Sequence, residues 1–136
     1  MMLTAKRAAI ICAHAVVGWA LCGATIGIGM AITTMERTLV IHAILAPTIF
    51  ALISWHYFAR FHYTSPLRTA LLFTGLVMAL DLFVVSILMY GNLDMFQSLV
   101  GTWIPFGLIL VATYTTGLLV TGAAARKAAV EGTKAR

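Results

Sequence analysis

The sequence has few charged residues. Only 10% of its 136 residues are charged, against 62% that are hydrophobic, and its mean hydropathy is +1.01. Soluble domains carry roughly a quarter of their residues as charged side chains, so this composition excludes an ordinary soluble domain. The sequence therefore predicts an all-α integral membrane protein whose main partner is the lipid bilayer.

Cysteine pairs and catalytic motifs are also lacking. Cys12 and Cys22 are ten residues apart in one apolar stretch, about 15 Å along a helix, which is too far for a disulfide. The serines have no aligned base with an orienting acid, and the glycines lie inside apolar runs rather than in phosphate-binding loops. The histidines are split between two depths and do not suit a metal site. We therefore predict a non-enzyme without a metal centre.

Four apolar stretches are long enough to cross a bilayer. They cover residues 8–32, 39–60, 67–90 and 96–121, and a short basic tail of residues 123–136 follows. No repeat or linker divides the chain, so a single domain over residues 1–136 is expected. Short connections predict an antiparallel up-down bundle of four transmembrane helices, in which neighbours in sequence are neighbours in space.

The basic residues stand near the ends of these spans. On one side lie Lys6, Arg7, Arg60, Arg68, Arg126, Lys127, Lys134 and Arg136, and on the other side lies Arg37 alone. Because positive charge concentrates in cytoplasmic loops, this asymmetry predicts an inner-membrane protein with both termini in the cytoplasm. It also removes the nucleic-acid interpretation of the net charge of +5, since no separate basic face remains.

The first span is rich in small residues. Gly23 and Gly27 form a GxxxG step, which permits close approach of another helix in a membrane. The approaching helix could come from the same bundle or from a second copy of the chain. Homo-oligomerisation through Gly23 and Gly27 is therefore one prediction.

Polar side chains within the spans fall into two layers by depth. The outer layer, about 21–28 Å from the cytoplasmic ends, takes one residue from each span. Its members are Thr25, His42, Asp81 and Thr102, and the inner layer comprises His14, His56, Thr74, Thr113 and Thr116. Spacings of seven, eleven or fourteen residues put the polar groups of each span on one helix face, so we expect four stripes that face one another.

Asp81 is the most unusual of these residues, because it interrupts the apolar run of residues 71–90. A carboxylate and an imidazole stabilise each other's charged forms, so Asp81 with His42 could be a proton-titrating pair or could bind a cation. The alternative is a neutral hydrogen-bonded pair that only holds the helices in register. Thr25 and Thr102 complete this predicted ion or proton site.

His14 and His56 could hold a haem b between two imidazoles at one depth. The fourteen-residue step from His42 to His56 resembles the spacing at which membrane cytochromes b suspend two haems from one helix. The resemblance is limited to that spacing, and no histidine stands opposite His42 in the outer layer. The alternative is that both histidines are satisfied by polar packing or by the interface.

Three functions are compatible with these features. The first is a small proton- or cation-linked transporter or channel-like protein that uses the Asp81–His42 site. The second is a non-catalytic accessory or assembly subunit of a membrane complex, whose polar residues only fix helix register. The third is a b-type haem membrane cytochrome that uses His14 and His56.

Overall fold

The computed structural model describes residues 3–135, and within this range it contains helices and turns but no strand. The helices in chain order are α1 (Ala5–Ile32), α2 (Met35–Arg60), α3 (Pro66–Leu80), the π-helix η1 (Asp81–Tyr90), the 3-10 helix η2 (Asp94–Gln97), the π-helix η3 (Leu99–Trp103) and α4 (Ile104–Lys134). Arg136, part of the predicted basic tail and of the charge count, lies outside the described residues together with residues 1 and 2.

Local sequence signals set most helix boundaries. The Thr34 hydroxyl accepts a hydrogen bond from the Arg37 amide and caps α2, and the Ser65 hydroxyl does the same for Arg68 in α3. Pro66 occupies the first turn of α3, where its missing N–H costs nothing. Gly91 ends η1 with a φ of 68°, a left-handed conformation that glycine adopts without strain.

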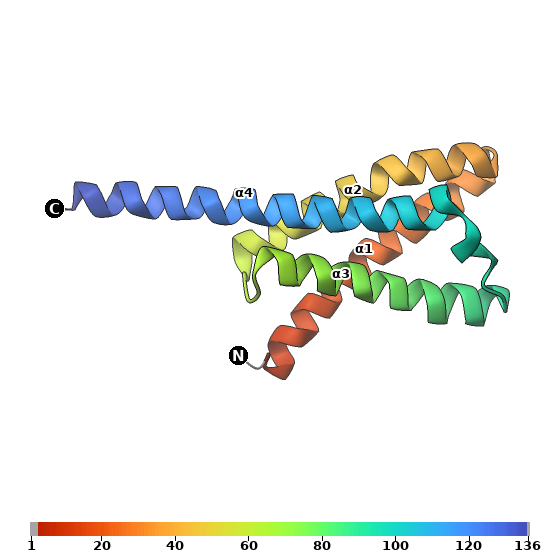
Figure 1. Cartoon of the computed structure of the whole chain (residues 1–136), viewed down its shortest axis with the longest axis horizontal. Helices are drawn as coiled ribbons and strands as arrows, with labels where there is room; N and C mark the ends of the chain where they lie inside the picture. The colour runs from red at the N-terminus through yellow and green to blue at the C-terminus, as the bar shows by residue number, and fades with distance from the viewer. Residues whose placement is uncertain (1–2, 136) are drawn as a thin grey trace.

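The helices differ from the predicted spans in two respects. The third span is one continuous rod over Pro66–Tyr90, as expected, but its second half is a π-helix that begins at Asp81. The fourth begins as the π-helix η3 and continues to Lys134, so residues 123–134 extend α4 rather than forming a separate tail. In Figure 1 this extension projects well beyond the other helices, and its side chains are exposed.

Small residues decide where the helices approach closely. A Cβ added at Gly18 would lie 2.5 Å from the Phe50 ring, and one at Gly29 would lie 2.5 Å from Thr38, so α2 rests directly on the backbone of α1. At Gly117 of α4 an added Cβ would lie 2.7 Å from the ring of Phe58 in α2. Thus α2 packs against α1 and α4, and α3 packs against the same two helices.

Aromatic rings fill the centre between α2 and α3. The ring of Phe73 in α3 lies 6.2 Å from that of Phe50 and 5.7 Å from that of Tyr57, measured between centroids, and all three side chains are fully buried. These rings keep the two backbones apart, so α2 and α3 stand on opposite sides of the bundle. The expectation that neighbours in sequence are neighbours in space is therefore wrong for this pair.

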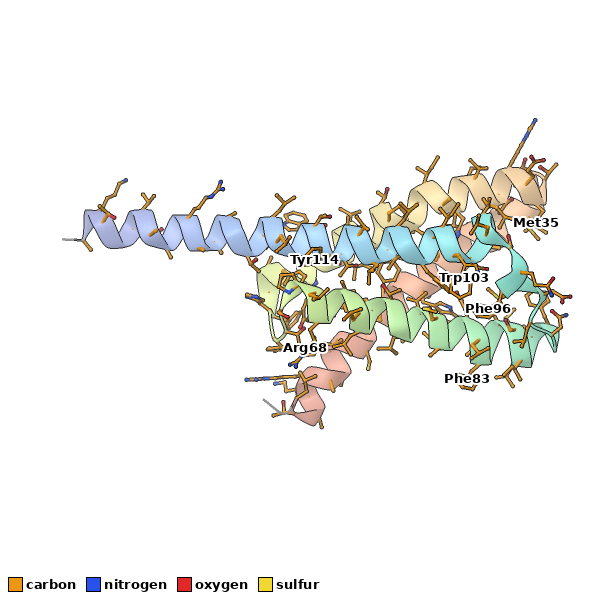
Figure 2. The ribbon with its side chains drawn as sticks, viewed as in Figure 1. Met35, Arg68, Phe83, Phe96, Trp103 and Tyr114 are labelled. Carbon is orange, nitrogen blue, oxygen red and sulfur yellow. The ribbon has the colours of Figure 1, made fainter. Side chains whose placement is uncertain are left out.

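Four helical segments are long and apolar enough to cross a membrane: Ala5–Ile32, Met35–Arg60, Pro66–Tyr90 and Leu99–Lys134. Figure 1 shows the α1–α2 connection and η2 at one end, and both termini toward the other. The outer surface carries many large apolar side chains: Phe83 is 60% exposed and points away from the bundle in Figure 2, and Leu88 is 78% exposed. Such a surface is unusual for a monomeric soluble protein and suits an apolar solvent.

Gly117 and Gly107 offer a matched test of this packing, since both lie in α4. In Gly117→Ala the new methyl group meets the Phe58 ring and, at 2.8 Å, Cβ of Pro66, so we expect a loss of about 1–3 kcal/mol in the free energy of unfolding. In Gly107→Ala the methyl group meets nothing within 4 Å, so we expect no loss or a gain of about 0.5–1 kcal/mol. Unfolding of the detergent-solubilised variants with sodium dodecyl sulfate measures both. Equal effects of the two substitutions would contradict this packing.

Candidate functional site

Asp81 stands at the point where α3 changes from an α-helix to a π-helix. Its backbone N–H is shared between the carbonyls of Val77 and Met78, four and three residues earlier in the chain. π-helical segments inside longer helices are uncommon and occur often at functional sites. The only acidic residue within the four apolar runs therefore coincides with the main irregularity of the third span.

The carboxylate of Asp81 is held by a tryptophan from another helix. The indole Nε1–H of Trp19 in α1 donates to Oδ1 of Asp81 at 2.8 Å, across the α1–α3 interface. Trp19 is partly buried and packs against the hydrophobic core. An indole can only donate, and a carboxyl oxygen can accept from it whether the group is ionised or protonated. The bond thus orients Asp81 without fixing its charge.

Trp19 was not among the predicted site residues, although the sequence contains a signal for it. Trp55 and Trp103 lie near the ends of their spans, as membrane-interface tryptophans do, whereas Trp19 lies near the middle of the first span. A buried tryptophan N–H needs an acceptor, and Asp81 is the strongest acceptor among the side chains of the four spans.

His42 and Asp81 are not joined directly in this structure, and their pairing stays a prediction. The Nδ1 atom of His42 is buried and has no hydrogen-bond partner, and no hydrogen bond or ion pair joins the two residues within the described range. Their predicted common depth is compatible with the arrangement of the two helices. The rings of Phe50 and Phe73 contact each other. His42 lies eight residues from Phe50, and Asp81 lies eight residues from Phe73, toward the same end of the bundle. Each is therefore about 12 Å of helical rise from that contact. They are separated because α2 and α3 stand on opposite sides.

Thr25 and Thr102 do not join the carboxylate either. The Thr25 hydroxyl donates to the Leu21 carbonyl of its own helix at 3.0 Å, and the Thr102 hydroxyl donates to the Met95 carbonyl at 2.5 Å. A helical threonine can satisfy itself on the preceding turn, so a polar stripe need not face another helix. The predicted group of four residues is therefore not joined by hydrogen bonds.

Several hydroxyls inside the bundle lack partners. The side-chain oxygens of Ser54, Thr74, Ser86 and Thr113 are buried and make no hydrogen bond within the described residues. Ser54 and Thr113 lie one turn before Phe58 and Gly117, which meet where the parallel helices α2 and α4 pack, so the two hydroxyls share one level. Buried polar atoms are normally satisfied, and such atoms are candidates to bind water or an ion.

His14 and His56 do meet, but on the outer face of α1 and α2. His14 Nε2 lies 3.1 Å from His56 Nδ1, and the two rings are stacked with centroids 5.3 Å apart. They line a groove of about 370 Å³ together with Ala13, Val17, Leu52 and Ile53.

This arrangement does not fit a haem between the two imidazoles. Two nitrogens on opposite sides of one metal ion, each bonded at about 2 Å, stand about 4 Å apart, and these two are in direct hydrogen-bond contact. Within the described residues no group of three or more His, Cys, Asp or Glu side chains could hold a metal ion. No step of the proposed function is therefore assigned to haem.

The Trp19–Asp81 bond can be tested by a double-mutant cycle. Trp19→Phe removes the donor, and we expect it to lower the free energy of unfolding by about 1–3 kcal/mol more than Trp55→Phe does. The Trp55 side chain is 59% exposed and makes no hydrogen bond to any described residue. In an Asp81→Leu background, which lacks the acceptor, the penalty of Trp19→Phe should shrink. Detergent unfolding of the four variants measures the coupling, and a penalty independent of residue 81 would contradict the bond.

Comparison of the chain with protein-family models, with curated proteins and with solved structures gives no match. There are two candidate sites. One comprises Asp81, Trp19, His42 and the unpartnered hydroxyls inside the bundle, and the other is the His14–His56 pair on the outer face.

Proposed function

We propose that this chain is an integral membrane protein of a cytoplasmic-type membrane, with four spans in antiparallel up-down order and both termini in the cytoplasm. The length and apolarity of the four helices support insertion. The end that carries both termini in Figure 1 also carries Lys6, Arg7, Arg60 and Arg68, while Arg37 lies at the opposite end. Positively charged loops tend to stay in the cytoplasm, so the end with more basic residues is assigned to the cytoplasmic side.

We propose further that the protein is a small proton- or cation-linked transporter or channel-like protein, in which Asp81 takes up and releases the proton or cation. The observation that carries this proposal is the Trp19–Asp81 hydrogen bond near the middle of the bundle. Within the described residues no Lys, Arg or His forms an ion pair with the carboxylate, and only Oδ1 has a hydrogen-bond partner. An ionised Asp81 in a bilayer therefore needs a proton or a cation from outside the protein.

The remaining polar groups inside the bundle support a path to this carboxylate. His42 lies at the same level as Asp81 and has a free ring nitrogen, and Ser54 and Thr113 lie nearer the end that holds the termini. Unpartnered hydroxyls and imidazoles can exchange hydrogen bonds with water or with a passing ion. In this proposal these groups are transient contacts, and Asp81 is the binding group.

A non-catalytic accessory or assembly subunit is the second candidate, and one observation favours it. The α4 extension over residues 123–134 is helical and exposed although it packs on no other part of the described chain. An isolated polar helix is marginal in water, so this segment would gain stability from a partner. In this role Trp19 and Asp81 only hold α1 and α3 in register.

Asp81→Asn separates these two functions. The amide keeps an oxygen that accepts from Trp19, so we expect the variant to fold with normal yield, but it cannot ionise. In proteoliposomes that contain a pH-sensitive dye, with an imposed potassium diffusion potential, we expect proton flux to fall at least tenfold relative to the parent protein.

Asp94→Asn is the matched control, because Asp94 lies exposed in the turn after the third span, and its flux should equal that of the parent. A parent protein no more active than empty liposomes, or an Asp81→Asn variant as active as the parent, would contradict the transport proposal. Copurification with a larger complex would then support the accessory role.

The topology can be tested with alkaline phosphatase fusions, since this enzyme is active only outside the cytoplasm. A fusion after Arg136 should be inactive, and a fusion after Asn92, in the turn between the third and fourth spans, should be active. A cytoplasmic fluorescent reporter should give the opposite pattern at both sites. Active phosphatase at the C-terminus would reverse the proposed orientation.

A further inference from the structure

The outer histidine pair forms a directional chain of hydrogen bonds. His14 Nδ1 lies 2.7 Å from the Ile10 carbonyl oxygen, which can only accept, so this nitrogen carries a proton. In the neutral imidazole His14 Nε2 is then an acceptor, and His56 Nδ1, 3.1 Å away, must donate to it. The remaining ring nitrogen, His56 Nε2, is left as an acceptor without a hydrogen-bond partner in the described chain.

The groove beside this chain is otherwise apolar. Ala13 and Val17 line it from α1, and Leu52 and Ile53 line it from α2. Its volume of about 370 Å³ lies in the range of small-molecule sites, which pair apolar walls with a few oriented polar groups. The pair is also fixed from behind, because the rings of Tyr57 and Phe61 contact His14 edge-on with centroids 5.5 Å away.

The residues that line the groove lie toward the end of the bundle that carries the basic residues. Arg7, seven residues before His14 and about 10 Å along α1, covers the ring of Tyr63 with its guanidinium 5.2 Å from the ring centroid. A molecule in the groove would therefore place a polar head near the histidines and its apolar body along α1 and α2. The other lining residues of the groove are apolar and offer no donor, so a free acceptor favours a ligand that brings its own donor.

We propose that this groove binds a lipid-soluble molecule with a hydroxyl donor, of the quinol or phenol class, whose hydroxyl hydrogen bonds to Nε2 of His56. A flat aromatic head fits beside the stacked imidazoles, and the aliphatic walls accept an isoprenoid or alkyl tail. The site is independent of Asp81 and of the proposed transport. A long-chain alcohol such as a diacylglycerol shares the donor chemistry but lacks the ring.

Binding can be measured with decylubiquinol under reducing conditions on the full-length protein in nanodiscs, by equilibrium partitioning and by ¹⁵N NMR of labelled histidine. Before addition both histidines should show protonated Nδ1, and binding should shift His56 Nε2. The quinol dimethyl ether, which has no donor, should bind about tenfold more weakly, as expected for the loss of one hydrogen bond in an apolar site. Dioctanoylglycerol serves as the second source of a hydroxyl group, and weaker binding than the quinol is expected.

Two variants locate the site. His56→Phe keeps a ring but removes the acceptor and should lower quinol affinity about tenfold. Leu52→Trp fills the groove from its wall and should block binding while the NMR signature of the His14–His56 pair persists, so a misfolded protein is distinguished from a filled groove. His62→Asn, at an exposed histidine outside the groove, is the control with parental affinity.

Equal binding of quinol and ether, equal affinity of His56→Phe and the parent, or no binding of quinol would each overturn the proposal. Tighter binding of dioctanoylglycerol than of quinol would overturn the assignment to the aromatic class.

Discussion

The places where two helices can approach closely determine which polar side chains of this bundle can meet. Gly18 and Gly29 let α2 rest on α1, and Gly117 lets it rest on α4. The rings of Phe50, Tyr57 and Phe73 then occupy the centre and hold α2 and α3 apart. In an apolar solvent, packing contacts of this kind drive helix association. As a consequence the backbone of α3 approaches α1 more closely than α2, and the partner available to Asp81 is Trp19.

The sequence predicted the number and approximate limits of the long helices because apolar length alone decides them. The predicted common depth of Asp81 and His42 is compatible with the helix arrangement, since the rise per residue is nearly constant. The sequence did not predict the partner of Asp81, because helix order around the bundle depends on individual glycines. The GxxxG step illustrates this: Cβ atoms added at Gly23 and Gly27 would meet nothing within 4 Å, so the bundle does not use it. A second copy remains the proposed occupant of that face.

The polar stripes were harder to interpret than their spacing suggested. Threonine hydroxyls bond to the preceding turn of their own helix, as Thr25 does, and so give no information about a neighbouring helix. The π-helix from Asp81 to Tyr90 also changes the angular step between residues, so faces counted with the α-helical period are displaced beyond Asp81. Histidine was ambiguous for a different reason. His14 and His56 hydrogen bond to each other on the outer face, an arrangement that helical periodicity alone does not separate from an inward-facing pair.

The two candidate sites differ in what they leave open. At the histidine pair, the hydrogen bonds place a proton on Nδ1 of each ring and leave Nε2 of His56 as an acceptor. A ligand at this site must therefore donate a hydrogen bond. At Asp81, the partner is an indole, a neutral donor that can bond to a carboxylate and, more weakly, to a carboxylic acid. An arginine or lysine in the position of Trp19 would have stabilised the ionised form and made protonation unfavourable. A neutral donor orients the group and leaves its charge free to change, and a binding site that must load and release a proton or a cation requires that property.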